Sequence, residues 1–201
     1  MQTVVTQGKY ARSETTIATV LEAAEKLFLE RSYADVSMRD IARAAGVTTG
    51  ALYHHFESKE ALYVGMLQTD FAAKRALLRA VLDDDATAKA SLRRLLEAFV
   101  QLPRAKRDLM HLVRRDVNYF RDPVRNRIVR AYQSGLPDIV EQVIADGIAQ
   151  GEIKPHPPRI LAWHLVALLE VALTPYALRE LAAGENVVDH VMEVFLDGVA
   201  A

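Results

Sequence analysis

The stretch from Ser37 to Phe56, SMRDIARAAGVTTGALYHHF, contains two short helical patterns separated by a glycine. Ser37 followed three residues later by Asp40 is typical of a helix N-terminus, where a hydroxyl and a carboxylate cap the first turn. Gly46 ends the first pattern, because glycine adopts the left-handed conformation that a sharp turn needs. Thr48 can cap the second pattern. Two short helices joined by a tight glycine-containing turn predict a helix-turn-helix.

The second helix of this motif carries the kind of surface that contacts DNA. Thr48 and Thr49 place hydroxyl and amide donors at its N-terminus, where phosphate oxygens bind well. Gly50 allows close approach of the backbone, and Tyr53 and His54 project from the outer side towards phosphates or base edges. No acidic residue occurs within this helix, so no carboxylate there repels DNA at short range.

The adjacent histidines have a second interpretation, as metal ligands. Neighbouring positions on a helix do not face each other, whereas histidine pairs that bind one metal are four residues apart. No HExxH motif or carboxylate–histidine cluster accompanies His54 and His55. The spacing therefore favours DNA contact for His54 and packing or capping for His55, and we predict no metal site and no cofactor.

A longer segment, SMRDIARAAGVTTGALYHHFESKEALY from Ser37 to Tyr63, closely resembles the DNA-binding signature of the tetracycline-repressor-like (TetR) family of bacterial transcription regulators. The specific matches are Ile41-Ala42, Ala45-Gly46-Val47, Leu52-Tyr53, Phe56 and Ser58-Lys59-Glu60-Ala61-Leu62. The preceding AAEKLFLERSYADVSM also matches, so the resemblance covers residues 13–63. One departure is Gly50-Ala51, which lacks a lysine that contacts phosphate in some relatives.

The resemblance implies a set of DNA contacts and a dimer. The residues expected to contact DNA are Ser37, Met38, Arg39, Thr48, Thr49, Gly50, Tyr53, His54 and Lys59. The first three would touch the DNA backbone from the start of the first motif helix, and Lys59 would contact phosphate. The resemblance also implies a homodimer through helices at about 159–174 and 186–198, bound to a palindromic operator with half-sites about 34–36 Å apart, or multiples of that.

Helical patterns continue through nearly the whole chain, and no segment alternates like a β-strand. Besides the motif, apolar residues recur at helical spacing over 13–31, 58–82, 88–101, 108–120, 122–150, 159–174 and 186–198. We therefore predict an all-α protein of about nine helices, with the 122–150 helix bent near Pro137. Residues 1–57 would form a three-helix DNA-binding domain, and residues 58–201 a larger ligand-binding and dimerisation domain.

The composition excludes several classes of protein. The chain has no cysteine, which excludes disulfides, thiolate nucleophiles and cysteine-based zinc sites. The polar N-terminus lacks the apolar core of a signal peptide. The longest apolar run, from Ile160 to Leu173, is shorter than the roughly 18–20 residues of a membrane-spanning helix. We therefore expect a cytoplasmic protein without a membrane partner. The net charge of −1 neither demands nor forbids DNA as a partner.

A small-molecule effector is expected in the C-terminal region, although the sequence does not name it. The candidate effector-binding residues are Phe99, His111, Arg115, Tyr119, Tyr132, Trp163 and Glu170. Each one alone also fits a core or surface position. The basic stretch 104–130 is typical of a solvated helix surface, unless Arg114 or Arg115 faces inward and binds an anionic ligand. Glu170 lies in an apolar helix, where a buried carboxylate must find a partner.

We expect a ligand-responsive repressor, released from DNA when the effector shifts the helix over 58–82; an activator or a co-repressor-dependent regulator of the same fold is the alternative. Two other classes compete with this hypothesis. An enzyme using His111 and Glu170 as acid and base lacks any recognised catalytic spacing and any glycine-rich nucleotide loop. A purely structural helical protein does not explain an acid-free, hydroxyl-capped helix beside Lys59.

Overall fold

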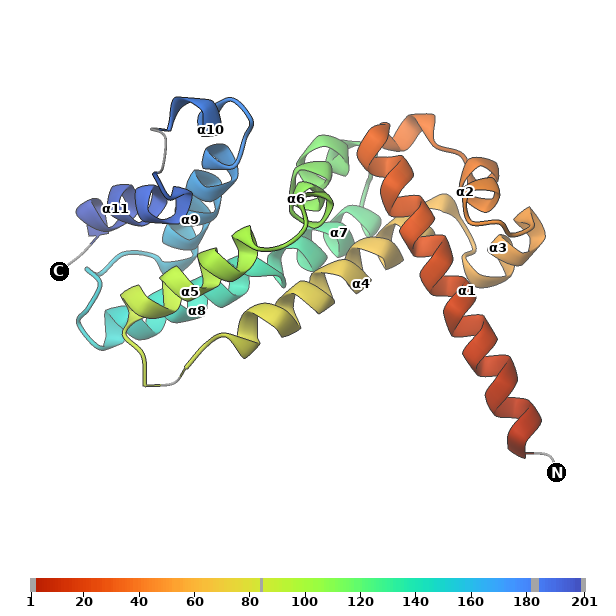
Figure 1. The fold of residues 1–201 in the computed structure, drawn as a ribbon, viewed down its shortest axis with the longest axis horizontal. Helices are drawn as coiled ribbons and strands as arrows, with labels where there is room; N and C mark the ends of the chain where they lie inside the picture. Colours follow the sequence, from red (N-terminus) through yellow and green to blue (C-terminus); the bar gives the residue numbers. More distant parts are fainter. Residues whose placement is uncertain (1–2, 84, 182–184, 200–201) are drawn as a thin grey trace. The chain divides into compact units, whose positions relative to one another are not determined.

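The computed structural model describes residues 3–83, 85–181 and 185–199, with side chains from residue 15 to residue 196 within these ranges. Every regular element in these ranges is a helix, so the all-α prediction is confirmed (Figure 1). The elements are α1 (Thr3–Glu30), η1 (Tyr33–Asp35), α2 (Met38–Ala44), α3 (Thr49–His55), α4 (Lys59–Ala80), α5 (Ala88–Val100), α6 (Arg104–Asp116), η2 (Val117–Tyr119), α7 (Val124–Gln133), α8 (Leu136–Ala149), α9 (Pro158–Ala172), α10 (Ala177–Glu180) and α11 (Val187–Val199).

The single helix expected over 122–150 is wrong, because two helices occupy this range. α7 ends at Gln133 and α8 begins at Leu136. A proline ring clashes with the carbonyl four residues earlier in a continuous helix, and four residues before Pro137 is Gln133. Pro137 instead lies in the first turn of α8, where its missing N–H leaves no hydrogen bond unmade. The break and the short α10 raise the α-helix count of the described ranges to eleven.

Two other boundaries differ from the sequence-based expectation. α1 begins at Thr3 instead of residue 13, and α6 begins at Arg104 instead of residue 108. The α6 difference follows from Pro103, which cannot continue a helix but readily precedes one. Arg104 therefore starts a helix directly after the break.

The chain divides into two compact units, which are described separately. Unit 1 contains residues 1–70 and 104–131, and unit 2 contains residues 71–103 and 132–201. These units follow packing contacts, so α6 and most of α7 belong with the helix-turn-helix in unit 1. The boundary between residues 57 and 58 divides the chain by expected function and stays a prediction.

Unit 1 is built around the helix-turn-helix. α2 packs against α1, and α3 against α2 (Figure 1). Phe28, Ile41 and Leu52 are fully buried, one from each of these helices. α6 also packs against α1. Lys106, near the start of α6, places its Nζ 2.5 Å from Glu25 Oε2 on α1 and 3.3 Å from Asp70 Oδ1 on α4.

An aromatic cluster closes the core of unit 1. The Tyr63 ring lies 4.9 Å from that of Phe28 and 5.1 Å from that of Phe120, centroid to centroid. The Tyr33 ring lies 4.5 Å from that of Phe120. Burial raises the pKa of Tyr33 to about 12, with a smaller contribution from the charge of Glu60. The pKa of Tyr63 is also raised, first by burial and then by a nearby carboxylate.

These raised pKa values predict unfolding at alkaline pH. In the unfolded chain both phenols ionise near their ordinary pKa of 10.0. Above that pH the unfolded state loses protons that the folded state keeps, so the free energy of unfolding falls between pH 10.0 and about 12. The loss of helical circular dichroism should therefore occur over the same pH range as the rise in tyrosinate absorbance from Tyr33 and Tyr63.

The double variant Tyr33→Phe, Tyr63→Phe is the control for this titration. It cannot ionise at either position, so its unfolding midpoint should move to higher pH. Ionisation of all seven tyrosines near their ordinary pKa, with unchanged circular dichroism, would contradict the prediction.

Unit 2 is built on four helices that contact one another in a ring. α8 packs against α5 and α9, and α11 packs against α9 and α5. Gly147 on α8 permits the close approach of α5, because an added Cβ would lie 2.6 Å from the Ala88 Cβ. Arg159 ties α9 to α8 through Nη1, 2.7 Å from Asp138 Oδ1, and Nη2, 2.5 Å from Glu141 Oε2.

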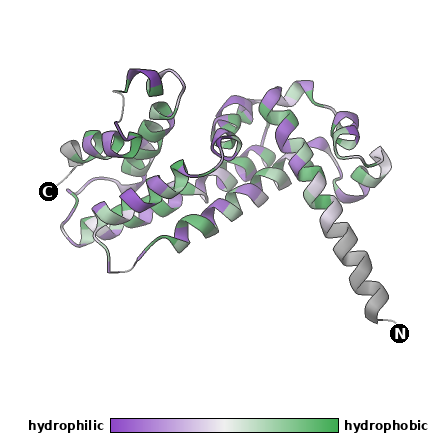
Figure 2. Cartoon of the chain, in the orientation of Figure 1, coloured by the Kyte–Doolittle hydropathy of each residue, from purple (hydrophilic) through white to green (hydrophobic). Residues whose placement is uncertain are grey.

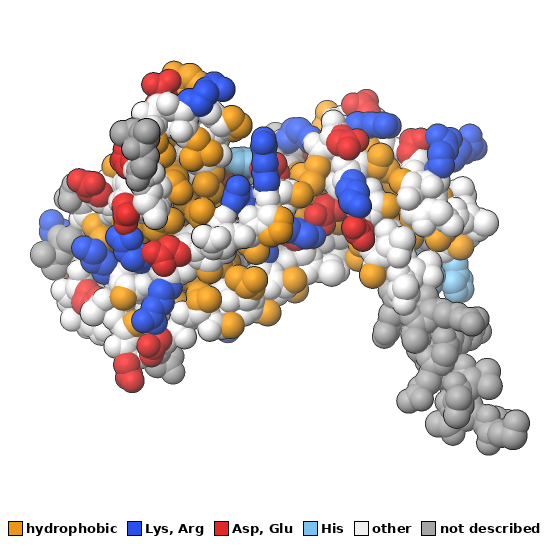
Figure 3. Space-filling model, in the orientation of Figure 1, with side chains coloured by type: hydrophobic (Ala, Val, Ile, Leu, Met, Phe, Trp, Pro, Cys, Tyr) orange, Lys and Arg blue, Asp and Glu red, His pale blue; other side chains and the backbone are white. Residues whose placement is uncertain are grey.

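The outer face of α9 remains apolar and exposed. The helix is mostly hydrophobic in Figure 2, and Figure 3 shows hydrophobic side chains gathered over it. Trp163 is 45% exposed and Val171 63% exposed, and Val194 on α11 is also half exposed. None of the helices in the described ranges combines the length and hydrophobicity needed to cross a membrane.

Candidate nucleic-acid interface

The first helix of the motif begins with the reciprocal cap that the sequence predicts. The Asp40 amide donates to Ser37 Oγ at 3.2 Å, and the Ser37 amide donates to Asp40 Oδ2 at 3.1 Å. The Ser37 hydroxyl donates to the same carboxylate oxygen at 2.6 Å. These bonds, the side-chain bond first, lower the pKa of Asp40. The carboxylate is thus held by the N-terminal cap of its own helix.

The turn uses glycine for its backbone conformation. Gly46 has a φ of 68°, and an added Cβ would meet no atom within 4 Å. A side chain is therefore disfavoured by the left-handed backbone and not by lack of space. The Val47 amide donates to the Ala42 carbonyl at 3.0 Å and closes the turn. Thr48 then caps α3 by accepting from the Ala51 amide at 3.1 Å, as predicted.

α3 has one anchored side and one exposed side. Leu52 is fully buried and holds the helix on unit 1, whereas Tyr53 is 50% exposed. Thr48, Gly50 and His54 are also exposed, and Thr49 is half-buried. Five of the nine predicted DNA contacts thus lie on α3 or its cap. The rings of His54 and His55 pack edge to face with centroids 5.3 Å apart, and His55 is half-buried.

The predicted contacts around α2 and α4 are placed differently. Arg39 is exposed, but the Met38 side chain is buried in the core of unit 1. Lys59 donates from Nζ to the carbonyls of Tyr33 at 2.7 Å and Val36 at 2.8 Å. Its ammonium also lies 4.1 Å from the centre of the Tyr33 ring, and its partial burial lowers its pKa. Two of its three N–H donors therefore bind the chain itself.

Arg115 was expected near an effector, but the structure places it against α1. Its Nη2 donates to the carbonyls of Phe28 at 2.7 Å and Arg31 at 2.9 Å, and its Nε donates to Asp116 Oδ1 at 2.8 Å. Asp116 is 0% exposed, and its other oxygen accepts from the Tyr63 hydroxyl at 3.2 Å. Sequence reasoning missed Asp116, because a single acid at the end of a basic helix carries no sign of burial.

The remaining effector candidates are spread over both units. His111 and Tyr119 are exposed in unit 1, and Phe99 is buried in the core of unit 2. The exposed Trp163 donates its indole N–H to Gln133 Oε1 at 3.3 Å.

Tyr132 and Glu170 are brought together in unit 2. The Tyr132 hydroxyl lies 3.4 Å from Glu170 Oε1, and Glu170 is almost fully buried. Lys74 on α4 is equally buried, with its Nζ 4.9 Å from the centre of the Phe71 ring, which contacts Tyr132 edge to face. Lys74 gave no signal in the sequence, because it reads as the polar side of an amphipathic helix.

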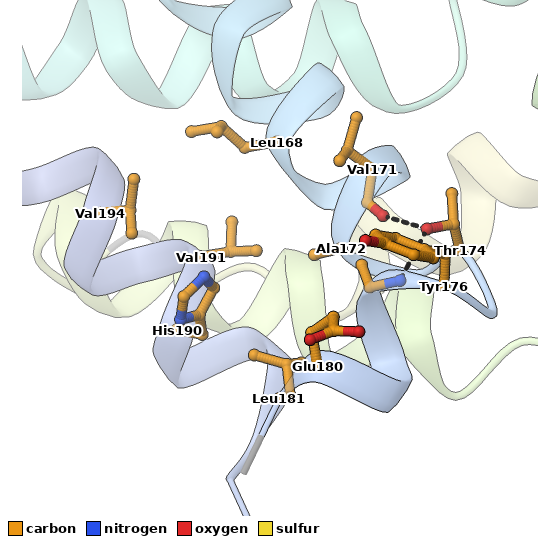
Figure 4. A pocket seen from close by; sticks show the side chains of 11 residues that line it. Leu168, Val171, Ala172, Thr174, Tyr176, Glu180, Leu181, His190, Val191 and Val194 are labelled. Carbon is orange, nitrogen blue, oxygen red and sulfur yellow. Dashed lines mark hydrogen bonds between the residues drawn. The ribbon is translucent and has the colours of Figure 1, made fainter.

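Unit 2 also has an apolar groove on its surface, between α9, α10 and α11. Its volume is about 410 Å³, and its walls include Leu168, Val171, Tyr176, Val191 and Val194 (Figure 4). A neighbouring groove of about 460 Å³ shares Leu168, Val171 and Val194 with it. The two grooves therefore form one continuous apolar face along α9 and α11.

Two family models match this chain. One, for bacterial regulatory proteins of the tetR family, matches residues 20–66, and the other, a tetracyclin repressor-like C-terminal domain, matches residues 85–199. The chain belongs to the TetR family. The first match contains the whole helix-turn-helix and Lys59, and the second covers α5 through α11.

Relatives of this TetR-family protein are similar in the motif or in the fold. The transcriptional repressor KstR2 of Rhodococcus jostii (strain RHA1) is 46% identical over 57 residues, 28% of this chain and 26% of that repressor. The match thus spans about a quarter of the curated relative. FadR of Bacillus subtilis, solved with stearoyl-CoA, has a TM-score of 0.75 at 19% identity, covering 90% of this chain and 98% of FadR. AibR, solved with isovaleryl coenzyme A and operator DNA, has a TM-score of 0.68 at 20% identity, covering 91% and 97%.

Proposed function

We propose that this TetR-family protein is a ligand-responsive transcriptional repressor whose α3 enters the major groove of an operator. The observation that carries the proposal is the exposed face of α3, which is hydroxyl-capped, acid-free and anchored from behind by Leu52. Thr48, Thr49 and Gly50 would meet phosphates at the helix N-terminus, and Tyr53 and His54 would reach base edges or phosphates. This role would place the protein in the cytoplasm.

The start of α2 would contribute backbone contacts in the same complex. Arg39 offers an exposed guanidinium to phosphate. Ser37 and Met38 would act through their position at the helix N-terminus, because the hydroxyl of one binds Asp40 and the side chain of the other is buried. Lys59 would have one remaining N–H donor for phosphate.

We also propose that two copies pair through the apolar face of α9 and α11. Large exposed apolar patches on a water-facing surface mark interaction sites. Val171 on α9 and Val194 on α11 expose such a patch and line both grooves, and Trp163 on α9 is also exposed. A two-fold dimer would present two α3 helices to a palindrome with half-sites about 34–36 Å apart, or multiples of that.

The double variant Val171→Glu, Val194→Glu should be monomeric. Two carboxylates on each copy would face carboxylates of the other copy across the two-fold axis, in a patch that pairing removes from water. Sedimentation velocity measures the change from dimer to monomer, and operator affinity should fall with it.

Leu77→Glu is the matched control for this variant. Leu77 is an exposed apolar residue on α4 that lines neither groove, so this variant should remain dimeric. A dimer that persists unchanged in the double variant would exclude the α9–α11 face.

The effector site is proposed around Tyr132 and Glu170 in unit 2. Burying the charged residues Lys74 and Glu170 in a helical core carries a desolvation cost, which a ligand site would account for. Coenzyme A thioesters are the first class to test, because FadR and AibR were solved with such compounds. A rise of the melting temperature with stearoyl-CoA or isovaleryl-CoA, lost in Glu170→Gln, would support the site; no rise in the wild type would exclude both compounds.

Selection of duplexes from a random DNA library tests the repressor proposal. We expect enrichment of one palindromic sequence, bound with an affinity that falls steeply as salt rises, by a slope of about 0.9 per phosphate neutralised. Failure to enrich any duplex at low salt would overturn the assignment. A reporter carrying the selected operator distinguishes a repressor from the alternative activator or co-repressor-dependent regulator of the same fold.

A further inference from the structure

Two cations hold the segment that leads from α1 into the helix-turn-helix. Arg115, from α6, binds the carbonyls of Phe28 and Arg31. Lys59, from α4, binds the carbonyls of Tyr33 and Val36. The four carbonyls follow one another along residues 28–36, which we call the connector. Its last residue directly precedes the cap of α2.

The connector depends on these cations because it has little regular structure of its own. After α1 ends, it contains only the three-residue helix η1. The carbonyls at a helix C-terminus have no partner within the helix. Arg115 supplies donors for Phe28 in the last turn of α1 and for Arg31 just beyond it. Lys59 supplies donors for Tyr33, the first residue of η1, and for Val36 just after η1. The entry into α2 is thus fixed by side chains from two other helices.

Arg115 is itself held in place from two sides. Its Nε and Nη2 both donate to Asp116, at 2.8 Å and 2.9 Å. Asp116 is fully buried and also accepts from the Tyr63 hydroxyl. A planar guanidinium presents its donors to the carboxylate and the two carbonyls in one fixed arrangement, whereas the three donors of an ammonium on a flexible stem have no such fixed geometry. The helix that carries Arg115 is anchored to α1 at its other end by Lys106 and Glu25.

We propose that Arg115, oriented by Asp116, is a positioning residue for DNA reading. Its hydrogen bonds go to the connector and to Asp116, and not to the exposed side of α3. It would act by fixing the connector, so that α2 and α3 are held in a single orientation on unit 1. The proposal rests on the operator binding proposed above. When only a fraction of molecules holds the competent placement, the apparent dissociation constant rises by the inverse of that fraction.

The decisive variants are Arg115→Lys and Asp116→Asn. Arg115→Lys keeps the positive charge but loses the planar guanidinium. Asp116→Asn keeps the shape of the side chain but loses the negative charge that orients the guanidinium. Arg125→Lys, at an exposed position on α7, is the matched control. The probe is the duplex selected by the wild type, and the active fraction of each protein is counted by stoichiometric titration.

We expect both variants to bind the duplex about tenfold more weakly per active molecule, with the wild-type salt slope. Amide hydrogen exchange over residues 31–37 should quicken in both, and Arg125→Lys should match the wild type. A wild-type dissociation constant with a smaller active fraction would show that Arg115 only stabilises the fold, and would overturn the proposal. A salt slope reduced by about 1 would show a direct phosphate contact and would overturn it as well.

The two proposals fail in different ways. If the wild type selects no duplex, operator binding and the positioning role fall together. If the wild type selects a duplex and both variants bind it as tightly as the wild type does, the positioning role alone is overturned.

Discussion

The double variant Tyr53→Ala, His54→Ala should bind the operator about 100-fold more weakly than the wild type, while remaining folded and dimeric. Each side chain projects from the exposed side of α3, and a good contact to a base edge contributes about 1–3 kcal/mol of discrimination. Both side chains are exposed, so their removal leaves no cavity in unit 1. Fluorescence anisotropy with the selected duplex measures the loss.

Tyr119→Ala is the control for this pair. Tyr119 is an exposed tyrosine of the same unit, 56% exposed, that lies on η2 and outside the helix-turn-helix. It should bind the duplex as the wild type does. Equal affinities for all three proteins would show that α3 does not read DNA.

Gly147→Val should lower the free energy of unfolding by about 3 kcal/mol, equivalent to a loss of roughly 10 °C in melting temperature. The Cβ alone would lie 2.6 Å from the Ala88 Cβ and 3.0 Å from Ile153 Cδ1. Neither Cβ can rotate away, so α5 and α8 must separate and lose packing along their contact. Thermal denaturation followed by circular dichroism measures the effect.

A double-mutant cycle separates this clash from the helix propensity of glycine. Within a helix, alanine is favoured over glycine by up to roughly 1 kcal/mol when no clash opposes it, and Gly147 lies in the last turn of α8. Because the added methyl group would clash with the Ala88 Cβ, Gly147→Ala should nevertheless destabilise the wild type. The destabilisation should be much smaller in an Ala88→Gly background. Gly50→Ala is the control, because its nearest foreign atom would lie 4.0 Å away. A stabilising Gly147→Ala in the wild type would contradict the close approach of α5 and α8.

The helix-turn-helix was predictable because its determinants are local. The Ser37–Asp40 cap and the Thr48 cap each join residues three positions apart. The turn depends on one glycine with a positive φ. The caps and the turn glycine can be recognised from the sequence without knowledge of the fold. The break before α8 could have been predicted from the sequence for the same reason, since Pro137 excludes a continuous helix through Gln133.

The cations could not be assigned in this way. Arg115 and Lys59 looked like surface residues available to an anionic ligand or to phosphate. Arg115 binds a carbonyl 87 residues away, and Lys59 binds one 26 residues away. Nothing near either residue in the chain indicates these partners. The buried Lys74 is a similar case, because only packing reveals that α4 buries this charge. Glu170 differs, because its position in an apolar helix already indicated burial.

For this protein, the sequence alone determined the helical class, the helix-turn-helix and the residues that α3 can present, because helix periodicity, capping and turn chemistry act over a few residues. The tertiary structure decided which partner each charge has: it placed Arg115 against the end of α1, Lys59 against the connector and Asp116 in the core. Those assignments depend on which helices meet, and contacts between residues far apart in the chain exist only once it has folded.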